Sequence, residues 1–162
     1  MFKIKLSILL LISVFLISCT DNQKRFPDHK YSLEYIAGGF DGLLLKNYLL
    51  SGLKNLDIYD PNSNYKIKAS IKHSSTFYIT SIDNTSEREK ISTDLFFQVI
   101  DTASQCQILN EQINVSQFYI YVPSDKLLSN QTASRKIKKD NTESSVKRLL
   151  HILRSTNHKC NE

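Results

Sequence analysis

The sequence is poor in the residues that most often build enzyme sites. It has no tryptophan, only four glycines and only three cysteines. Two of the glycines are adjacent, and no glycine-rich phosphate loop or nucleophile elbow can be written. The four histidines are scattered and lack the spacing of metal ligands. We therefore expect a protein that is not an enzyme and that uses no cofactor and no metal.

The chain also lacks an apolar run long enough to cross a membrane. Spanning the hydrocarbon core takes about 20 consecutive apolar residues, and the N-terminal run, residues 6–17, is shorter. Two lysines precede this run and the small Ser18 follows it. This is the layout of a cleaved secretory signal, so we expect residues 1–18 to be removed on export.

The segment "LISC" closes the apolar run at Cys19 and resembles the bacterial lipobox. The resemblance implies that the Cys19 thiol receives a diacylglycerol and that the new amine is acylated, for example with palmitate. Each buried methylene of these chains adds about 0.8 kcal/mol, which anchors the chain stably. The alternative is an ordinary signal peptide with a chance cysteine. By the sorting rules of enteric bacteria Thr20 favours the outer membrane, while Asp21 leaves the inner membrane open.

Charge is distributed unevenly along the rest of the chain. Residues 125–162 contain nine Lys or Arg residues and four Asp or Glu residues, whereas residues 19–124 are slightly acidic. A basic segment of this kind suits an anionic partner. Export argues against nucleic acid as that partner.

Two cysteines remain besides Cys19, namely Cys106 and Cys160. In an oxidising compartment such a pair forms a disulfide or stays as two free thiols, and the sequence leaves both outcomes open. His158 stands two residues before Cys160, but a lone His-x-Cys is too little for a metal site.

Hydrophobic periodicity indicates a single domain at residues 30–157, after a polar lipidated tether at 19–29 and before a short tail at 158–162. "KYSLEYI" alternates and predicts a strand with Tyr31 and Tyr35 on its buried side. A leucine stripe at helical spacing then predicts a helix whose N-terminus is capped by Asp41.

Three further strands are predicted between residues 65 and 122, with a bulge at "HSS" (73–75) and a bulge or twist near Gln117, where the apolar phase changes. The chain ends in an amphipathic helix. Residues 138–145 are polar on all sides, which predicts either a helix that passes through solvent or a break. The order strand, helix, three strands, helix predicts an α+β fold. We expect a two-layer sandwich, a four-stranded mostly antiparallel sheet with two helices packed on one face.

These features together resemble the LPS-assembly lipoprotein LptE family, in particular its alphaproteobacterial members. The resemblance is carried by the lipobox, the helix "LLLKNYLLSGL", the turn and strand "IDNTSEREKISTDLFFQVID", and the passage from "FYIYVPSD" into a long helix. The order and spacing of these four segments are the main basis for the resemblance. The chain departs from the family by having "TDNQ" after the cysteine and a last helix with few alanines at its start.

The resemblance implies a domain that plugs the lumen of an LptD-like outer-membrane β-barrel, assists the assembly of that barrel and binds lipopolysaccharide. By position, Arg88 and Lys90 match the family's basic site after the turn. Lys126, Arg135 and Lys136 lie in its second basic region, without a residue-by-residue match. The alternatives are that Arg88 pairs with Glu87 or Glu89, and that the basic cluster is a solvated helix face.

Two other functions stay open at this stage. One is a periplasmic lipoprotein adaptor of another envelope or transport complex, and the other is a lipoprotein enzyme. A catalytic constellation in the folded chain would favour the enzyme, whereas the identity of the partner separates the plug from the adaptor.

Overall fold

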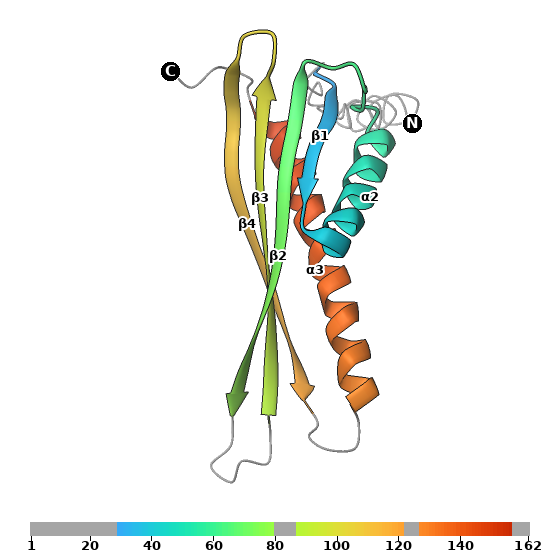
Figure 1. The fold of residues 1–162 in the computed structure, drawn as a ribbon, viewed down its shortest axis with the longest axis vertical. Coiled ribbons are helices and arrows are strands. Elements are labelled where there is room, and N and C mark those ends of the chain that lie inside the picture. The colour runs from blue at the N-terminus through green and yellow to red at the C-terminus, as the bar shows by residue number, and fades with distance from the viewer. Residues whose placement is uncertain (1–28, 80–86, 122–126, 157–162) are drawn as a thin grey trace, which may run out of the picture.

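The computed structural model describes residues 29–79, 87–121 and 127–156 (Figure 1). The signal, Cys19, Lys126 and Cys160 lie outside the described residues. The elements in chain order are β1 (Tyr31–Ala37), α2 (Gly39–Asn55), β2 (Tyr65–Ile79), β3 (Glu87–Asp101), β4 (Cys106–Tyr121) and α3 (Leu127–Ser155).

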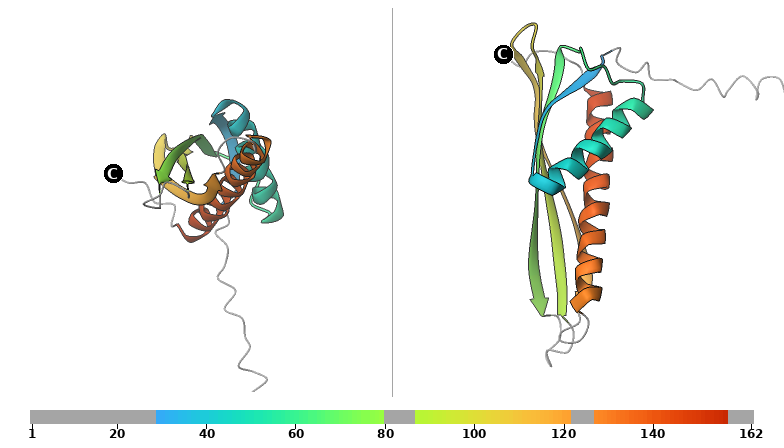
Figure 2. Two further views of the ribbon diagram at one scale, coloured as in Figure 1. Left: turned by 90° about the horizontal axis from the view of Figure 1, so that it is seen from below. Right: turned by 45° about the vertical axis from the view of Figure 1, so that its right-hand side comes forward.

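The four strands form one mixed sheet in the order β1-β2-β3-β4. β1 runs parallel to β2, and the β2–β3 and β3–β4 pairs are antiparallel. Both helices cover the same face of this sheet (Figure 2). The predicted α+β sandwich is therefore confirmed. We call the uncovered side the open face, and the end where β2 and β4 finish and α3 begins the distal end.

The main core lies between the helices and the sheet, toward the other, proximal end. α2 contributes Leu45, Leu49 and Leu53, and α3 contributes Leu149 and Leu153, all fully buried. Each such side chain contributes about 1.5–3 kcal/mol on burial. Alternation in β3 points Leu95, Phe97 and Val99 into this core, whereas Asp94 and Gln98 point to the open face.

The distal half of the molecule is thinner than the proximal half. β1 pairs only with the Tyr65–Ser70 part of β2 and then leads into α2. α3 alone continues beside the three long strands to the distal end (Figure 1). The distal half is thus three strands and one helix.

α3 is one continuous helix of 29 residues, so neither prediction for residues 138–145 is correct. Asn141, Thr142 and Ser145 are fully buried against the sheet. The Asn141 amide donates to the Ile91 carbonyl over 3.2 Å. On the sheet, Thr93 is also buried, and its hydroxyl lies 2.7 Å from Nδ1 of His73. We call these five residues, His73, Thr93, Asn141, Thr142 and Ser145, the buried polar layer.

Both predicted bulges are wrong, because the β2–β3 ladder is regular through residues 73–75 and the β3–β4 ladder is regular at Gln117. Register shifts occur in β1 between Leu33 and Tyr35, and in the β3–β4 pair between Val99 and Ile100. The shift in β1 leaves the Tyr35 side chain 64% exposed, not buried as predicted.

The start of α2 also differs from the prediction. The cap position is held by Gly38, whose φ is 124°, and the helix begins at Gly39. Asp41 lies inside the first turn, and no side-chain cap hydrogen bond forms. Its carboxylate lies 3.8 Å from Nε2 of His73 instead.

Candidate functional site

The open face at the distal end carries two of the predicted basic residues. Arg88 and Lys90 stand two residues apart on β3, so both point to the same face. In the register, Arg88 lies between Tyr78 of β2 and Ile120 of β4, and Lys90 is opposite Phe118. We call these five residues the distal tip.

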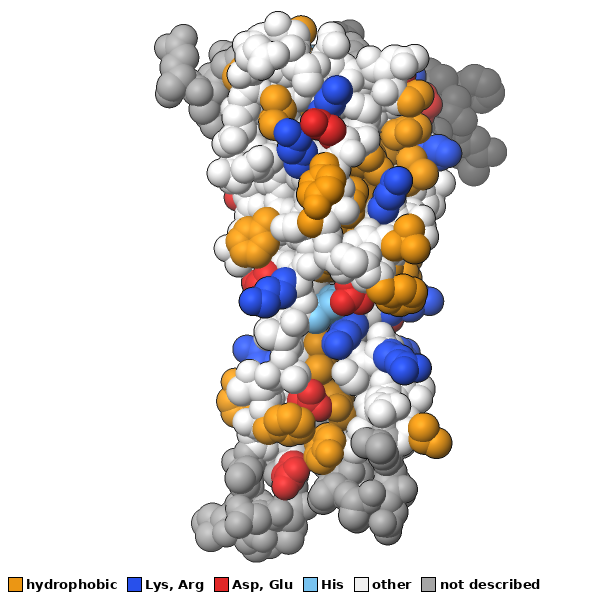
Figure 3. All heavy atoms as spheres, in the orientation of Figure 1, with side chains coloured by type: hydrophobic (Ala, Val, Ile, Leu, Met, Phe, Trp, Pro, Cys, Tyr) orange, Lys and Arg blue, Asp and Glu red, His pale blue; other side chains and the backbone are white. Residues whose placement is uncertain are grey.

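Apolar side chains of the distal tip are exposed beside the cations. Tyr78, Phe118 and Ile120 are 42%, 56% and 67% exposed. The Tyr78 and Phe118 ring centroids are 5.7 Å apart, and Nζ of Lys90 lies 5.9 Å from the Phe118 centroid. The ammonium therefore sits within cation–π range of the ring, which holds a positive charge next to apolar surface. Figure 3 shows apolar side chains interspersed with charged ones at this end of the molecule.

The acidic neighbours of Arg88 point to the opposite face of the sheet. Glu89 is only 7% exposed, and the Tyr119 hydroxyl donates a hydrogen bond to its carboxylate. Burial, together with Glu89, raises the pKa of Tyr119, so the phenol stays a donor. Glu87 shares that face by strand alternation. Among the described residues Arg88 forms no ion pair, so the predicted alternative pairing is not seen.

The other predicted site residues are not brought into the distal tip. Arg135 and Lys136 are exposed on α3, which packs on the covered face, so the sheet separates them from Arg88 and Lys90. Cys106 begins β4 at the proximal end and is disulfide-bonded. Its predicted partner Cys160 lies outside the described residues, so that pairing stays a prediction.

The apolar half of the distal tip was not predicted from the sequence. The phase of Phe118 and Ile120 opposes that of Ile113, and this indicated a bulge or twist near Gln117. The ladder instead stays regular and places them on the open face. The sequence did carry a signal for this exposed apolar surface. Apolar residues occupy both faces at the end of β4, and only one face of the sheet is covered, so the other apolar face must be exposed.

The described ranges hold no group of three or more His, Cys, Asp or Glu side chains arranged to bind a metal ion. No helix in the same ranges is long and apolar enough to cross a membrane.

Comparison with known proteins shows a shared fold. No protein-family model matches the chain, and no curated protein matches it by sequence. The structure of a minor lipoprotein from Acinetobacter baumannii matches with a TM-score of 0.59 and 14% identity, covering 80% of this chain and 93% of that one. Rare lipoprotein B from Shewanella oneidensis gives 0.54 and 12%, covering 76% and 92%. A lipoprotein B from Nitrosomonas europaea gives 0.54 and 13%, covering 80% and 84%. The chain thus has the fold of several solved bacterial lipoproteins.

Proposed function

We propose that this protein is an LptE-type lipoprotein of the outer membrane, and that its role is not enzymatic. In this role Cys19 carries the lipid anchor on the periplasmic side. The folded domain plugs an LptD-like β-barrel, helps that barrel to assemble and assists the insertion of lipopolysaccharide into the outer leaflet. The observation that carries the proposal is the distal tip, on a fold shared with solved lipoproteins.

The composition of the distal tip suits a phosphorylated lipid. A lipid A headgroup presents phosphates next to acyl chains. Arg88 offers a guanidinium fork and Lys90 a point charge, the two side-chain types that bind phosphate best. Phe118 and Ile120 supply exposed apolar surface within the same patch. One small surface therefore matches both parts of such a lipid.

The shape of the domain supports a plug. The three long strands and α3 run side by side and make a narrow, elongated body (Figure 2). β2 places Lys66, Lys68 and Lys72 on the open face. The lumen of a large outer-membrane barrel is polar, so a polar outer surface is complementary to it.

The partner is tested by affinity purification. The tagged, lipidated chain is isolated from its own envelope in mild detergent, and co-purifying proteins are identified by mass. We expect one large β-barrel in near-stoichiometric amount. If the chain is recovered with an inner-membrane complex, this would favour the adaptor function. If the chain is recovered without a partner, this would refute the plug function.

The lipid contact is tested with the double substitution Arg88→Glu and Lys90→Glu. Charge-assisted hydrogen bonds of about 1.5–3 kcal/mol are lost, so binding of fluorescently labelled lipopolysaccharide should weaken about tenfold or more. The domain should stay folded, because both side chains are on the surface, and recovery of the barrel is measured as a separate readout. The double substitution Lys46→Glu and Lys54→Glu, at two exposed positions of α2, changes the net charge equally and is the matched control. Equal loss of lipid binding in the control would mean that only net charge matters.

A further inference from the structure

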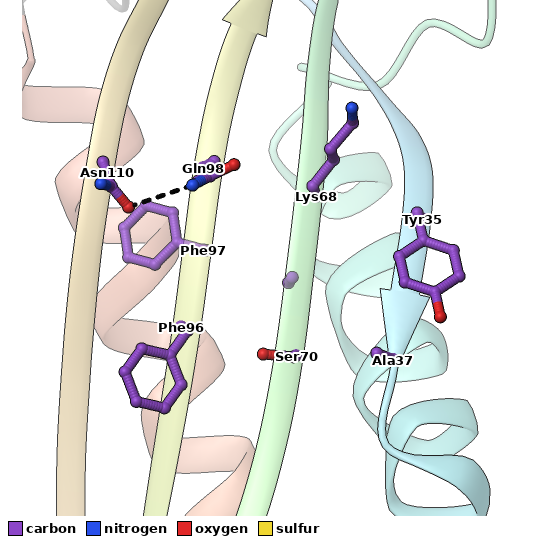
Figure 4. A pocket seen from close by; sticks show the side chains of 9 residues that line it. Tyr35, Ala37, Lys68, Ser70, Phe96, Phe97, Gln98 and Asn110 are labelled. Atoms are coloured by element: carbon purple, nitrogen blue, oxygen red, sulfur yellow. Dashed lines mark hydrogen bonds between the residues drawn. The ribbon is translucent and has the colours of Figure 1, made fainter.

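A pocket on the open face, far from the distal tip, is not part of the proposed lipid contact. Figure 4 shows it between the rings of Tyr35 on β1 and Phe96 on β3, with Ser70 of β2 between them. Its volume is about 380 Å³, within the range of about 300–1,000 Å³ that is typical of ligand sites. We call it the open-face pocket.

The bulge in β1 builds one wall of the open-face pocket. Leu33 pairs with Ile67, but Tyr35 pairs with Lys68, so Glu34 is the extra residue. Without that extra residue, Tyr35 would stand opposite Ala69 and point at the core. The bulge turns the ring to the open face, where it is 64% exposed. Bulges often re-aim a side chain next to a functional site.

Small residues form the floor between the two rings. Ala37 pairs with Ser70, and Ser70 pairs with Phe96, so this row of the sheet has almost no side-chain bulk before the Phe96 ring. Phe96 is 46% exposed although large and apolar. The rings therefore border a space that the side chains of the described residues leave open.

The next row of paired residues across the sheet lines the open-face pocket with polar groups, and the positive charge in this row is balanced. Lys68, Gln98 and Asn110 are successive partners across β2, β3 and β4. Nζ of Lys68 lies 3.4 Å from the Glu34 carboxylate, which balances its charge. Nε2 of Gln98 donates to Oδ1 of Asn110 over 3.4 Å, and this leaves Oε1 of Gln98 and Nδ2 of Asn110 as an acceptor and a donor.

We propose that the open-face pocket binds a hexopyranose unit of a cell-envelope glycan. A pyranose has a face of C–H groups, which packs on aromatic rings, and a rim of hydroxyls, which need both donors and acceptors. Tyr35 and Phe96 fit the first requirement, and the amide row fits the second. The neutral balance of Glu34 and Lys68 favours an uncharged ligand over an anion.

This site is independent of the proposed lipid contact. Gln98 and Arg88 are ten residues apart on β3, which corresponds to about 30 Å along a strand. Glycan binding and barrel recovery can therefore fail separately, and Tyr35→Ala should leave both barrel recovery and lipopolysaccharide binding at the distal tip unchanged.

Saturation-transfer difference NMR on the full mature chain in detergent tests the proposal. Two probes distinguish the source of the glycan: chitotriose represents the peptidoglycan backbone, and delipidated core oligosaccharide represents lipopolysaccharide. We expect transfer to the ring C–H protons of at least one probe. Loss of one aromatic wall in Tyr35→Ala or Phe96→Ser should weaken binding about tenfold. Phe40→Ser, which removes an exposed aromatic ring near the start of α2, should leave binding unchanged.

Three results would overturn the proposal. One is no transfer to either probe at millimolar concentration. The second is transfer that both wall variants retain, with unfolding temperatures equal to that of the parent chain. The third is saturation transfer to the peptide acetyl-Ala-Phe-Ala-amide but to neither glycan, which would assign the pocket to a protein partner.

Discussion

At the scale of single residues, the start of α2 depends on the absence of side chains. Gly42 is buried, and a Cβ added there would lie 2.7 Å from the Ala37 carbonyl oxygen. That atom belongs to the backbone at the end of β1, so it cannot rotate away. The turn from β1 into α2 therefore requires close approach of two backbones, which only glycine allows.

Gly42→Ala should lower the free energy of unfolding by about 1–3 kcal/mol, the usual cost of overpacking. The measurement is urea denaturation followed by circular dichroism. Gly39→Ala is the control, because a Cβ there meets nothing within 4 Å although φ is +58°. The decrease in the free energy of unfolding for Gly39→Ala should be smaller, about 1 kcal/mol, which is the cost of placing an alanine in the left-handed region. Equal losses would mean that backbone strain, not contact with Ala37, sets the cost.

His73 is the buried ionisable group of the buried polar layer. Its side chain is 3% exposed, with Thr93 at one nitrogen and Asp41 near the other. Burial lowers the pKa of His73; Asp41 opposes this shift and Lys138 adds to it. The folded chain therefore resists protonation of this ring.

Stability should fall as the pH drops below about 6.5, the ordinary pKa of histidine. Below about 6.5 the His73 ring of the unfolded chain binds a proton that the folded chain still excludes, so folding becomes less favourable. The stability that His73 contributes above pH 6.5 is therefore lost as the pH falls through the lowered pKa of the folded chain. The free energy of unfolding measured from pH 7.5 to 5 checks this. His73→Gln should flatten the curve and exposed His151→Gln should not; the reverse pattern would contradict the assignment.

At the scale of elements, the sequence predicted each strand and helix that has an apolar stripe, because alternation and helical spacing are local signals. The middle of α3 has no such stripe. Its continuity depends on Asn141 reaching the Ile91 carbonyl, fifty residues away in the chain. A hydrogen-bond partner so far away in the sequence produces no periodic pattern in the residues around Asn141. A buried polar segment and a solvent-exposed polar segment therefore have the same appearance in the sequence.

Ser145→Ala in α3 should stabilise the protein. The Ser145 hydroxyl is fully buried and has no hydrogen-bond partner among the residues that the structure describes. Removing it relieves a desolvation cost of about 1–3 kcal/mol, of which we expect roughly 1 kcal/mol to appear as stability. Ser144→Ala, on the same helix but partly exposed, measures the gain in helix propensity alone. Equal melting temperatures for the two variants would count against a buried, unpaired hydroxyl.

At the scale of the whole molecule, the sheet has four strands at its proximal end and three at its distal end. Within the described part of the chain, β2 has neighbouring strands on both sides only from Tyr65 to Ser70. Part of the candidate site could be predicted at this scale, because a turn followed by Arg88 and Lys90 is visible in sequence. The open-face pocket could not, because the bulge that turns Tyr35 outward is defined by its pairing with Lys68.

Amide hydrogen exchange should divide β2 into two parts. Outward-pointing amides of Lys66–Ser70 bond to β1, whereas those of Lys72–Tyr78 lack a neighbouring strand among the described residues. We expect the second group to exchange much faster, at a rate set by local opening, while the first follows global unfolding. Uniform protection along β2 would indicate that something else covers its distal edge.

The length of the strands sets the distance between the proximal and distal ends of the molecule. β3 has 15 residues, which at about 3.3 Å each span roughly 50 Å. β1 begins at the proximal end, shortly after the predicted lipid at Cys19, whereas Arg88 stands near the opposite end. A hydrocarbon core is about 30 Å thick. In the role proposed above, a domain tethered at the inner leaflet and standing upright in a barrel would reach the level of the outer leaflet, and shorter strands would leave the distal tip below it.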